Sequence, residues 1–204
     1  MSAAFDPATT ALLLVDLQND FIHPEGTYAR GGAKSEAIAA LPARLRPLAG
    51  AMRAAGGWIV STHFTLVPGR GSDEVLIGAH LKQLRPFLRR GDFAPGSWGQ
   101  QLVDTLAPSD IAVEKVAFSA FYMSRLEWVL RQAGIRSLIV GGIVTNGGVA
   151  STVRDAHVRE FEVTVLRDGC AAFRPEVHEA AIADLGSICR ISDCAGELER
   201  LSGL

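Results

Sequence analysis

Asp16, His63 and Lys115 are ionisable residues that each follow a segment whose composition predicts a β-strand. A carboxylate beside an ammonium can hold or transfer a proton, which suits acid–base catalysis. Each residue also has a structural interpretation: Asp16 as a helix or turn cap, His63 as a hydrogen-bonding residue, and Lys115 as an exposed strand end. They are candidates for catalysis only if the fold brings them together.

A glycine-rich turn is the fourth candidate. An apolar segment, 138–140, runs into Gly141-Gly142-Ile143-Val144-Thr145-Asn146-Gly147-Gly148, and a helix is expected from there to about Arg159. Such a turn points backbone N–H groups at one place, which suits an anion or a developing oxyanion. The other candidate residues gain a function from this turn if they lie beside it.

The elements that must position these residues follow from apolar patterning. Short apolar or β-branched segments predict strands at 11–15, 58–62, 110–114, 137–141, 162–166 and 188–191. Helices are predicted at 35–55, 98–106, from the turn to 159, and at 175–185, and a further helix follows Ser119-Ala120-Phe121 and ends at Gly134. In the first of these helices, Pro42 and Pro47 predict a break or kink. The alternation predicts a doubly wound α/β fold, in which a parallel sheet carries helices on both faces and binds ligands at the carboxyl ends of its strands.

The composition is that of a globular protein, with 204 residues, 48% hydrophobic and 21% charged, and a net charge of −2. We expect one domain spanning residues 1–204. The charge balance argues against a nucleic-acid partner, and we interpret the basic cluster from Arg85 to Arg90 as exposed surface. The apolar runs are too short for a membrane span. Three cysteines without CxxC spacing indicate reduced thiols in a cytoplasmic protein.

Several segments, in this order and at these spacings, resemble the isochorismatase-like hydrolase superfamily, also called the cysteine hydrolases. They are the segment 13–21 around Asp16, Glu114-Lys115, Ser119-Ala120-Phe121, and the turn with its flanks, 142–149. The match covers nearly the whole chain. It implies a three-layer sandwich with a six-stranded parallel sheet, an active site at the strand ends, a small-molecule substrate, and a homodimer or homotetramer.

In most of that family an Asp, a Lys and a Cys form the site, and the thiolate attacks an amide or nitrile carbon. The resemblance assigns the first two roles to Asp16 and Lys115. Gly148 occupies the position of the Cys, and glycine offers no nucleophile. The isochorismatase branch also has glycine there and hydrolyses a vinyl ether without a covalent intermediate. The resemblance therefore implies water as the nucleophile and Asp16 as a general acid, whose pKa must be raised by desolvation.

The family commonly has a cis peptide in the turn, which corresponds here to Ile143–Val144. This bond would direct the N–H groups of Val144 and Gly148 toward a substrate oxygen. The other residues expected to bind substrate are Phe21, His63, Phe121 and Thr145. No cofactor is expected, and no metal, because the Asp/His cluster of the nicotinamidase branch is absent after the second strand.

Two departures from the isochorismatase branch leave the substrate open. Ala117 and Phe118 stand where that branch carries an Arg and an aromatic hydroxyl, and Phe64-Thr65-Leu66 stands where it carries a glutamine. Arg70 is a candidate for the missing cation. Two alternatives to a water-based hydrolase are a catalytically silent relative that binds a metabolite, and an amidohydrolase that uses Cys170. For this cysteine, the interpretation as a small buried apolar residue is favoured over that as a nucleophile.

Overall fold

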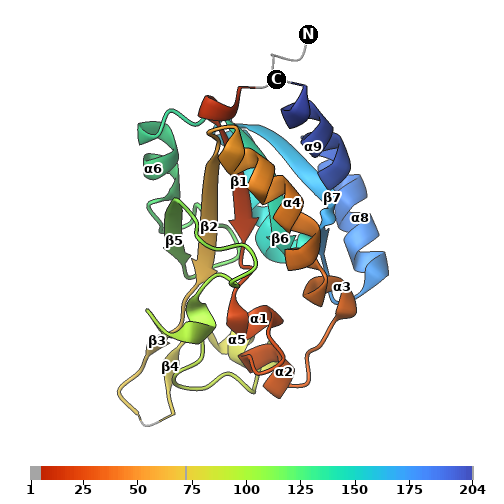
Figure 1. The fold of residues 1–204 in the computed structure, drawn as a ribbon. Coiled ribbons are helices and arrows are strands. Elements are labelled where there is room, and N and C mark those ends of the chain that lie inside the picture. Colours follow the sequence, from red (N-terminus) through yellow and green to blue (C-terminus); the bar gives the residue numbers. More distant parts are fainter. Residues whose placement is uncertain (1–5, 72, 204) are drawn as a thin grey trace.

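A sheet of six parallel strands forms the centre of the computed structural model, which describes residues 6–71 and 73–203 (Figure 1). The strands are β1 (Thr10–Val15), β2 (Trp58–Phe64), β5 (Ile111–Lys115), β6 (Ser137–Ile143), β7 (Glu162–Ala171) and β8 (Arg190–Ser192). Their order across the sheet is β5-β2-β1-β6-β7-β8, and every neighbouring pair is parallel. The predicted six-stranded parallel sheet is confirmed.

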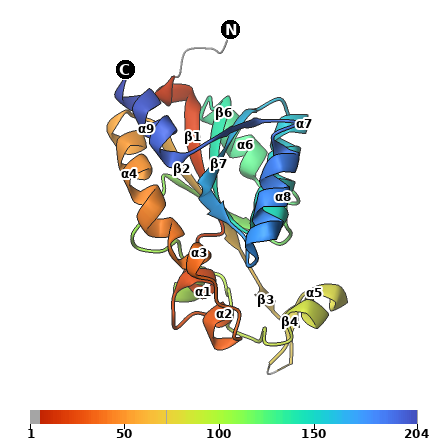
Figure 2. The same cartoon turned by 90° about the vertical axis from the view of Figure 1, so that its right-hand side faces the viewer.

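Helices cover both faces of this sheet, as Figure 2 shows. One face carries α3 (Glu36–Ala39), α4 (Leu41–Ala54) and α9 (Cys194–Ser202), and the other carries α6 (Leu126–Gln132), α7 (Ala150–Val158) and α8 (Pro175–Leu185). Beyond the carboxyl ends of β1 and β2 lie α1 (Asn19–Ile22), α2 (Thr27–Arg30), α5 (Ala79–Leu84), and a small hairpin of β3 (Val67–Pro68) and β4 (Val75–Leu76). The result is the predicted three-layer α/β arrangement.

The strand β1 lies at the centre because its side chains are apolar on both faces. Leu13 and Val15 belong to the core under α6, α7 and α8, while Leu12 and Leu14 belong to the core under α4 and α9. This alternation follows from the two-residue period of a strand. Burying each such side chain stabilises the fold by about 1.5–3 kcal/mol, so a continuous apolar run is strongly held in a central position.

The helix predicted for 35–55 is two helices, separated at Ala40. Ser35 caps the first, since its hydroxyl accepts a hydrogen bond from the N–H of Ile38. Pro42 lies in the first turn of α4, where its missing N–H removes no helical hydrogen bond. Pro47 lies inside α4 without ending it. The predicted break therefore occurs before one proline and not at the other.

Two other predicted helices are shorter than expected. The helix predicted for 98–106 is only a 3-10 turn, Trp98–Gln100, because Leu102 pairs with Gln18 in an antiparallel bridge. The helix expected between Phe121 and Gly134 spans only Leu126–Gln132. The last helix, α9, and the β3–β4 hairpin had no counterpart among the predicted elements.

The chain leaves the two central strands in opposite directions across the sheet. From β1 it proceeds to β2 and β5, and from β6 to β7 and β8. In open parallel sheets, ligands bind beyond the carboxyl ends of strands at such a switch point. Asp16 directly follows β1, and the glycine-rich turn follows β6, so both candidates lie at this point. None of the described helices has the length and apolar character needed to cross a bilayer.

Candidate active site

Asp16 and Lys115 form an ion pair at the carboxyl ends of their strands. The Lys115 Nζ and Asp16 Oδ2 atoms are 2.7 Å apart, and both side chains are almost completely buried. Thr62, on the strand between them, donates its hydroxyl to the other Asp16 oxygen over 3.1 Å. The expected meeting of carboxylate and ammonium therefore occurs, across one intervening strand.

The ammonium group of Lys115 is fully occupied by the protein. Besides Asp16, it donates to the carbonyl oxygens of Ala117 and Phe118, at 2.8 and 3.2 Å. An ammonium has three N–H donors, and each of them has an acceptor here. The Phe64 ring faces the same cation with its centroid 5.8 Å away. Lys115 is thus fixed in place for Asp16 rather than free to bind a ligand.

The environment of Asp16 raises its pKa. Burial raises the pKa of this carboxyl above its ordinary value of 3.8, and the Lys115 ammonium opposes the rise only in part. A raised pKa allows a carboxyl group to act as a proton donor near neutral pH. The Asp16 backbone also has φ of 56°, a left-handed conformation that costs a non-glycine residue about 1–2 kcal/mol. Residues held in such conformations cluster at functional sites.

The glycine-rich turn closes against Asp16. The Ile143–Val144 peptide is cis, as the resemblance implies, and a single π-helical turn, Thr145–Val149, follows it. A β-carbon added to Gly148 would lie 3.2 Å from Asp16 Oδ2 and 2.7 Å from the carbonyl oxygen of Ile143. Position 148 therefore lies directly beside the Asp16 carboxyl group, and the Ile143 carbonyl oxygen leaves no room there for a side chain.

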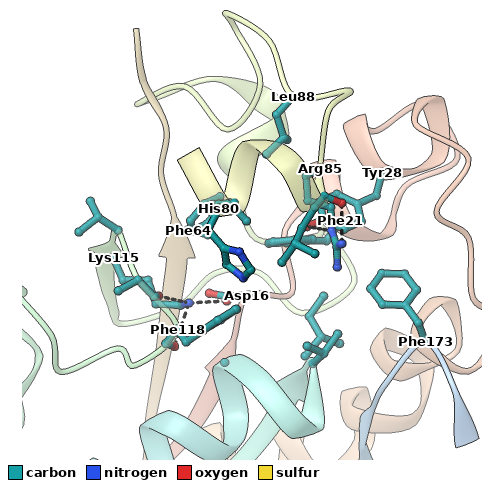
Figure 3. A pocket seen from close by; sticks show the side chains of 17 residues that line it. Asp16, Phe21, Tyr28, Phe64, His80, Arg85, Leu88, Lys115, Phe118 and Phe173 are labelled. Carbon is teal, nitrogen blue, oxygen red and sulfur yellow. Dashed lines mark hydrogen bonds and ion pairs between the residues drawn. The ribbon is translucent and has the colours of Figure 1, made fainter. Parts of the chain in front are cut away.

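A cavity of about 250 Å³ opens over the ion pair and the turn (Figure 3). Asp16, Lys115, Val144, Gly148 and Phe21 line it, all five of which we expected at the site. Most of the remaining wall is apolar, including Phe64, Leu81, Leu84, Leu88, Phe118 and Phe173. Pockets for drug-sized ligands occupy about 300–1,000 Å³, so this cavity suits a smaller molecule with an apolar body.

Three residues expected to bind substrate lie outside this cavity. His63 faces the other way along β2, because its neighbour Thr62 faces Asp16 and successive side chains alternate. Its Nε2 pairs with the Ser61 hydroxyl at 2.9 Å, and burial lowers its pKa. Phe121 packs in the core against Phe161. The Thr145 hydroxyl is fully buried and pairs with His178 Nδ1 at 2.8 Å, so it ties the turn to α8.

The arginine that lines the cavity is Arg85, and the candidate Arg70 lies elsewhere. Arg70 is exposed and does not line the cavity, whereas Arg85, at the end of α5, lies in its wall with His80 and Tyr28. The interpretation of the cluster from Arg85 to Arg90 as exposed surface is therefore wrong for its first residue. Strand periodicity could not have found these residues, since they come from short helices and connecting segments.

Cys170 lies inside the core rather than at the site. It is part of β7, its Sγ atom contacts the Val140 carbonyl oxygen at 3.7 Å, and burial raises the pKa of its thiol to about 12. A nucleophilic cysteine needs a lowered pKa and access to substrate, and Cys170 has neither. Among residues 6–71 and 73–203, no three His, Cys, Asp or Glu side chains are grouped so that they could hold a metal ion.

The chain is similar to known proteins over most of its length. The isochorismatase domain matches residues 10–193. Ureidoacrylate amidohydrolase RutB of Methylobacterium radiotolerans is 36% identical over 195 residues, which cover 89% of this chain and 75% of that protein. The ureidoacrylate amidohydrolase RutB of Caulobacter vibrioides is 32% identical over 214 residues, covering 97% and 94% of the two chains.

Among solved structures, a cysteine hydrolase from Pseudomonas syringae pv. phaseolicola 1448A aligns with a TM-score of 0.80 at 26% identity. The alignment covers 100% of this chain and 99% of that one. The shared fold thus extends over the whole length of both proteins, including the strand ends that carry the cavity.

Proposed function

The chain belongs to the isochorismatase domain family of hydrolases, and from this premise we propose that it hydrolyses a small molecule by acid–base chemistry at Asp16, with no covalent thiol intermediate. One observation carries the proposal: position 148, beside the Asp16 carboxylate, is a glycine whose β-carbon direction is blocked by the Ile143 carbonyl oxygen. The usual nucleophile of the family has no counterpart there, and water must take its role.

The chemistry that suits this site best is hydrolysis of a vinyl ether. Asp16, whose pKa is raised by burial, is the general acid: its carboxyl group donates a proton to the terminal alkene carbon, and the electrons of the double bond form the new C–H bond. The adjacent carbon becomes an oxocarbenium ion. Water adds to that carbon and returns a proton to the Asp16 carboxylate. The resulting hemiketal then expels the alcohol and leaves a carbonyl product.

Lys115 acts on this reaction through Asp16. Its ammonium lies against the carboxylate and stabilises the negative charge that remains once the proton has been donated. Two carbonyl acceptors fix the ammonium, so it stabilises this charge without moving. Lys115 is therefore a positioning residue, and Asp16 is the group that exchanges protons with substrate and water.

A second candidate reaction is hydrolysis of a C–N bond in a small ureide. The observation that favours it is the likeness to two ureidoacrylate amidohydrolases. Here Asp16 would act as a base toward water that attacks the carbonyl carbon. The alternative with Cys170 as nucleophile is disfavoured, because that thiol is buried and has a pKa of about 12. The cytoplasmic location and the homo-oligomeric state stay predictions.

The test uses 2-phenoxyacrylate and 3-ureidoacrylate as probes with the wild-type protein in D₂O. Protonation of the alkene places one deuterium on the methyl carbon of the pyruvate released from 2-phenoxyacrylate, which NMR detects. Direct attack on the ureido carbonyl of 3-ureidoacrylate instead releases carbamate, which breaks down to ammonia and CO₂, and leaves 3-aminoacrylate, an enamine that takes up deuterium only as it later hydrolyses in D₂O. Labelled pyruvate from the first probe and ammonia from the second therefore separate the two reactions.

Asp16→Asn tests the role of the acid, with Asp104→Asn, a change at an exposed carboxylate, as the matched control. Loss of general-acid catalysis should lower kcat by about 10²–10⁴ in the first variant and leave it unchanged in the second. Iodoacetamide should not lower wild-type activity. Full activity in Asp16→Asn, or inactivation by alkylation, would overturn the proposal.

A further inference from the structure

The charges that line the cavity do not balance. Besides His80 and Tyr28, its wall contains three ionisable side chains: Asp16, Lys115 and Arg85. The first two neutralise each other as an ion pair. Arg85 then leaves a net charge of +1 in a cavity whose other lining is largely aromatic and aliphatic. A cation in an apolar cavity favours a ligand that carries one negative charge.

Arg85 is held toward the cavity by weak, neutral partners. Its Nε–H donates to the Tyr28 hydroxyl at 3.3 Å, and one terminal N–H donates to the Leu84 carbonyl oxygen at 2.9 Å. The guanidinium carbon lies 5.8 Å from the centroid of the Tyr28 ring. Figure 3 shows the guanidinium pointing inward beside that hydroxyl. A guanidinium has five N–H donors, so most of them are available to a ligand.

No protein carboxylate pairs with Arg85 in the part of the chain that the structure describes. Arg30, on α2, shows the contrast, since one of its terminal nitrogens donates to both carboxylate oxygens of Asp92. Lys115 cannot serve as an alternative anion site, because all three of its donors are occupied. Of the lysine and arginine residues that line the cavity in the described part of the chain, Arg85 is therefore the one available to bind an anion.

We propose that Arg85, oriented by Tyr28, binds the carboxylate of the substrate, and that the substrate class is a small, largely apolar monocarboxylate. The aromatic wall packs against the apolar body of the molecule, and the guanidinium binds the carboxylate through two parallel hydrogen bonds. This inference rests on the proposed function, which places the reacting bond of the substrate at Asp16 while Arg85 holds the carboxylate. The size of the cavity limits the class to small molecules.

The test measures binding without turnover, by ¹⁹F NMR titration of the full-length protein with 4-fluorobenzoate and 4-fluorobenzamide. The two probes have nearly the same shape and differ in charge. Charge-assisted hydrogen bonds contribute about 1.5–3 kcal/mol, so the wild type should bind the benzoate about tenfold to a hundredfold more tightly than the benzamide. Its benzoate affinity should fall as salt is added, and its benzamide affinity should not.

Arg85→Gln should lose this preference and keep its benzamide affinity, which shows that the cavity is intact. Arg89→Gln is the matched control, because Arg89 is exposed and does not line the cavity. If Arg85→Gln fails to fold, the salt dependence of the wild type still decides. Equal wild-type affinity for both probes, or a benzoate preference that survives in Arg85→Gln, overturns the inference.

These outcomes are separate from the fate of the proposed reaction. A benzoate preference that depends on Arg85, in a protein that hydrolyses neither of the acrylate probes, would retain the anion site and refute the hydrolysis. Hydrolysis that depends on Asp16 together with equal binding of the two probes would do the reverse.

Discussion

Replacing Gly148 with alanine should destabilise the protein more than the same change at Gly147, one residue earlier in the same turn. At position 148 the new methyl group would lie 2.7 Å from the backbone carbonyl oxygen of Ile143, which cannot rotate away. At position 147 its nearest neighbour, at 3.0 Å, is a methyl group of the Val144 side chain, which can adjust. The two glycines thus differ in what blocks them, not in their helical setting.

The expected difference can be worked from these contacts. Overpacking against atoms that cannot yield costs about 1–3 kcal/mol. Replacing a helical glycine with alanine gains about 1 kcal/mol in helix propensity, and this gain is common to both variants. Gly148→Ala should therefore be about 1–3 kcal/mol less stable than Gly147→Ala. For a domain of this size, each kcal/mol changes Tm by about 2–4 °C.

The assay is urea unfolding of both variants and the wild type, followed by circular dichroism, with hydrolytic activity measured on the same samples. Activity should fall in Gly148→Ala, because the methyl group lies 3.2 Å from Asp16 Oδ2, where substrate or water must approach. Gly147→Ala should retain most of it. Equal stability of the two variants, or a fully active Gly148→Ala, would show that the Ile143 carbonyl oxygen and the Asp16 carboxyl group leave room for a side chain at position 148.

Three further predictions concern the buried groups. Because the pKa of Asp16 is raised on folding, the folded state binds the proton more tightly, so this group's contribution to stability is present below pH 3.8 and is lost as pH rises through the folded pKa. The free energy of unfolding of the wild type, relative to Asp16→Asn, should fall by up to about 1.4 kcal/mol per pH unit in that window, and a flat difference in urea titrations would contradict this. Lys115→Met should lower the free energy of unfolding by about 3–5 kcal/mol at pH 8, because Asp16 is then left as an uncompensated buried charge. The loss should be smaller at pH 5, because Asp16 can take up a proton there. Equal losses at both pH values would count against the ion pair. Cys170→Ala should retain wild-type kcat, since the thiol is buried outside the cavity, and a loss of activity in a folded variant would return Cys170 to consideration.

The pairing of Asp16 with Lys115 could be predicted because parallel strands end at one edge of the sheet. Each residue lies at the carboxyl end of a segment with a clear strand pattern, and the sheet aligns these ends. The glycine-rich turn was predictable for the same reason. The end of a strand fixes how far along the sheet a residue lies. This position is enough to place the residue at the site only when its side chain also faces the site.

The direction of the His63 side chain could not be predicted in the same way. His63 lies at the right position along the sheet, but it faces away from Asp16, because its neighbour Thr62 faces toward it. Which of two successive residues faces a site depends on how the strand is registered and twisted in the sheet. A buried strand with apolar residues on both faces does not reveal that choice in its sequence.

The chain's own sequence therefore determined the parallel sheet, the edge that carries the site, and the absence of a nucleophile at position 148, because these depend on local pattern and residue type. Only the tertiary structure decided that Arg85 and Tyr28, from two short helices distant in sequence, together form part of the cavity wall, and that each N–H of the Lys115 ammonium already has an acceptor. The physical reason is that pattern along a chain specifies which face of an element is buried. The contacts between side chains distant in sequence depend instead on how loops fold over the sheet, and no periodicity encodes them.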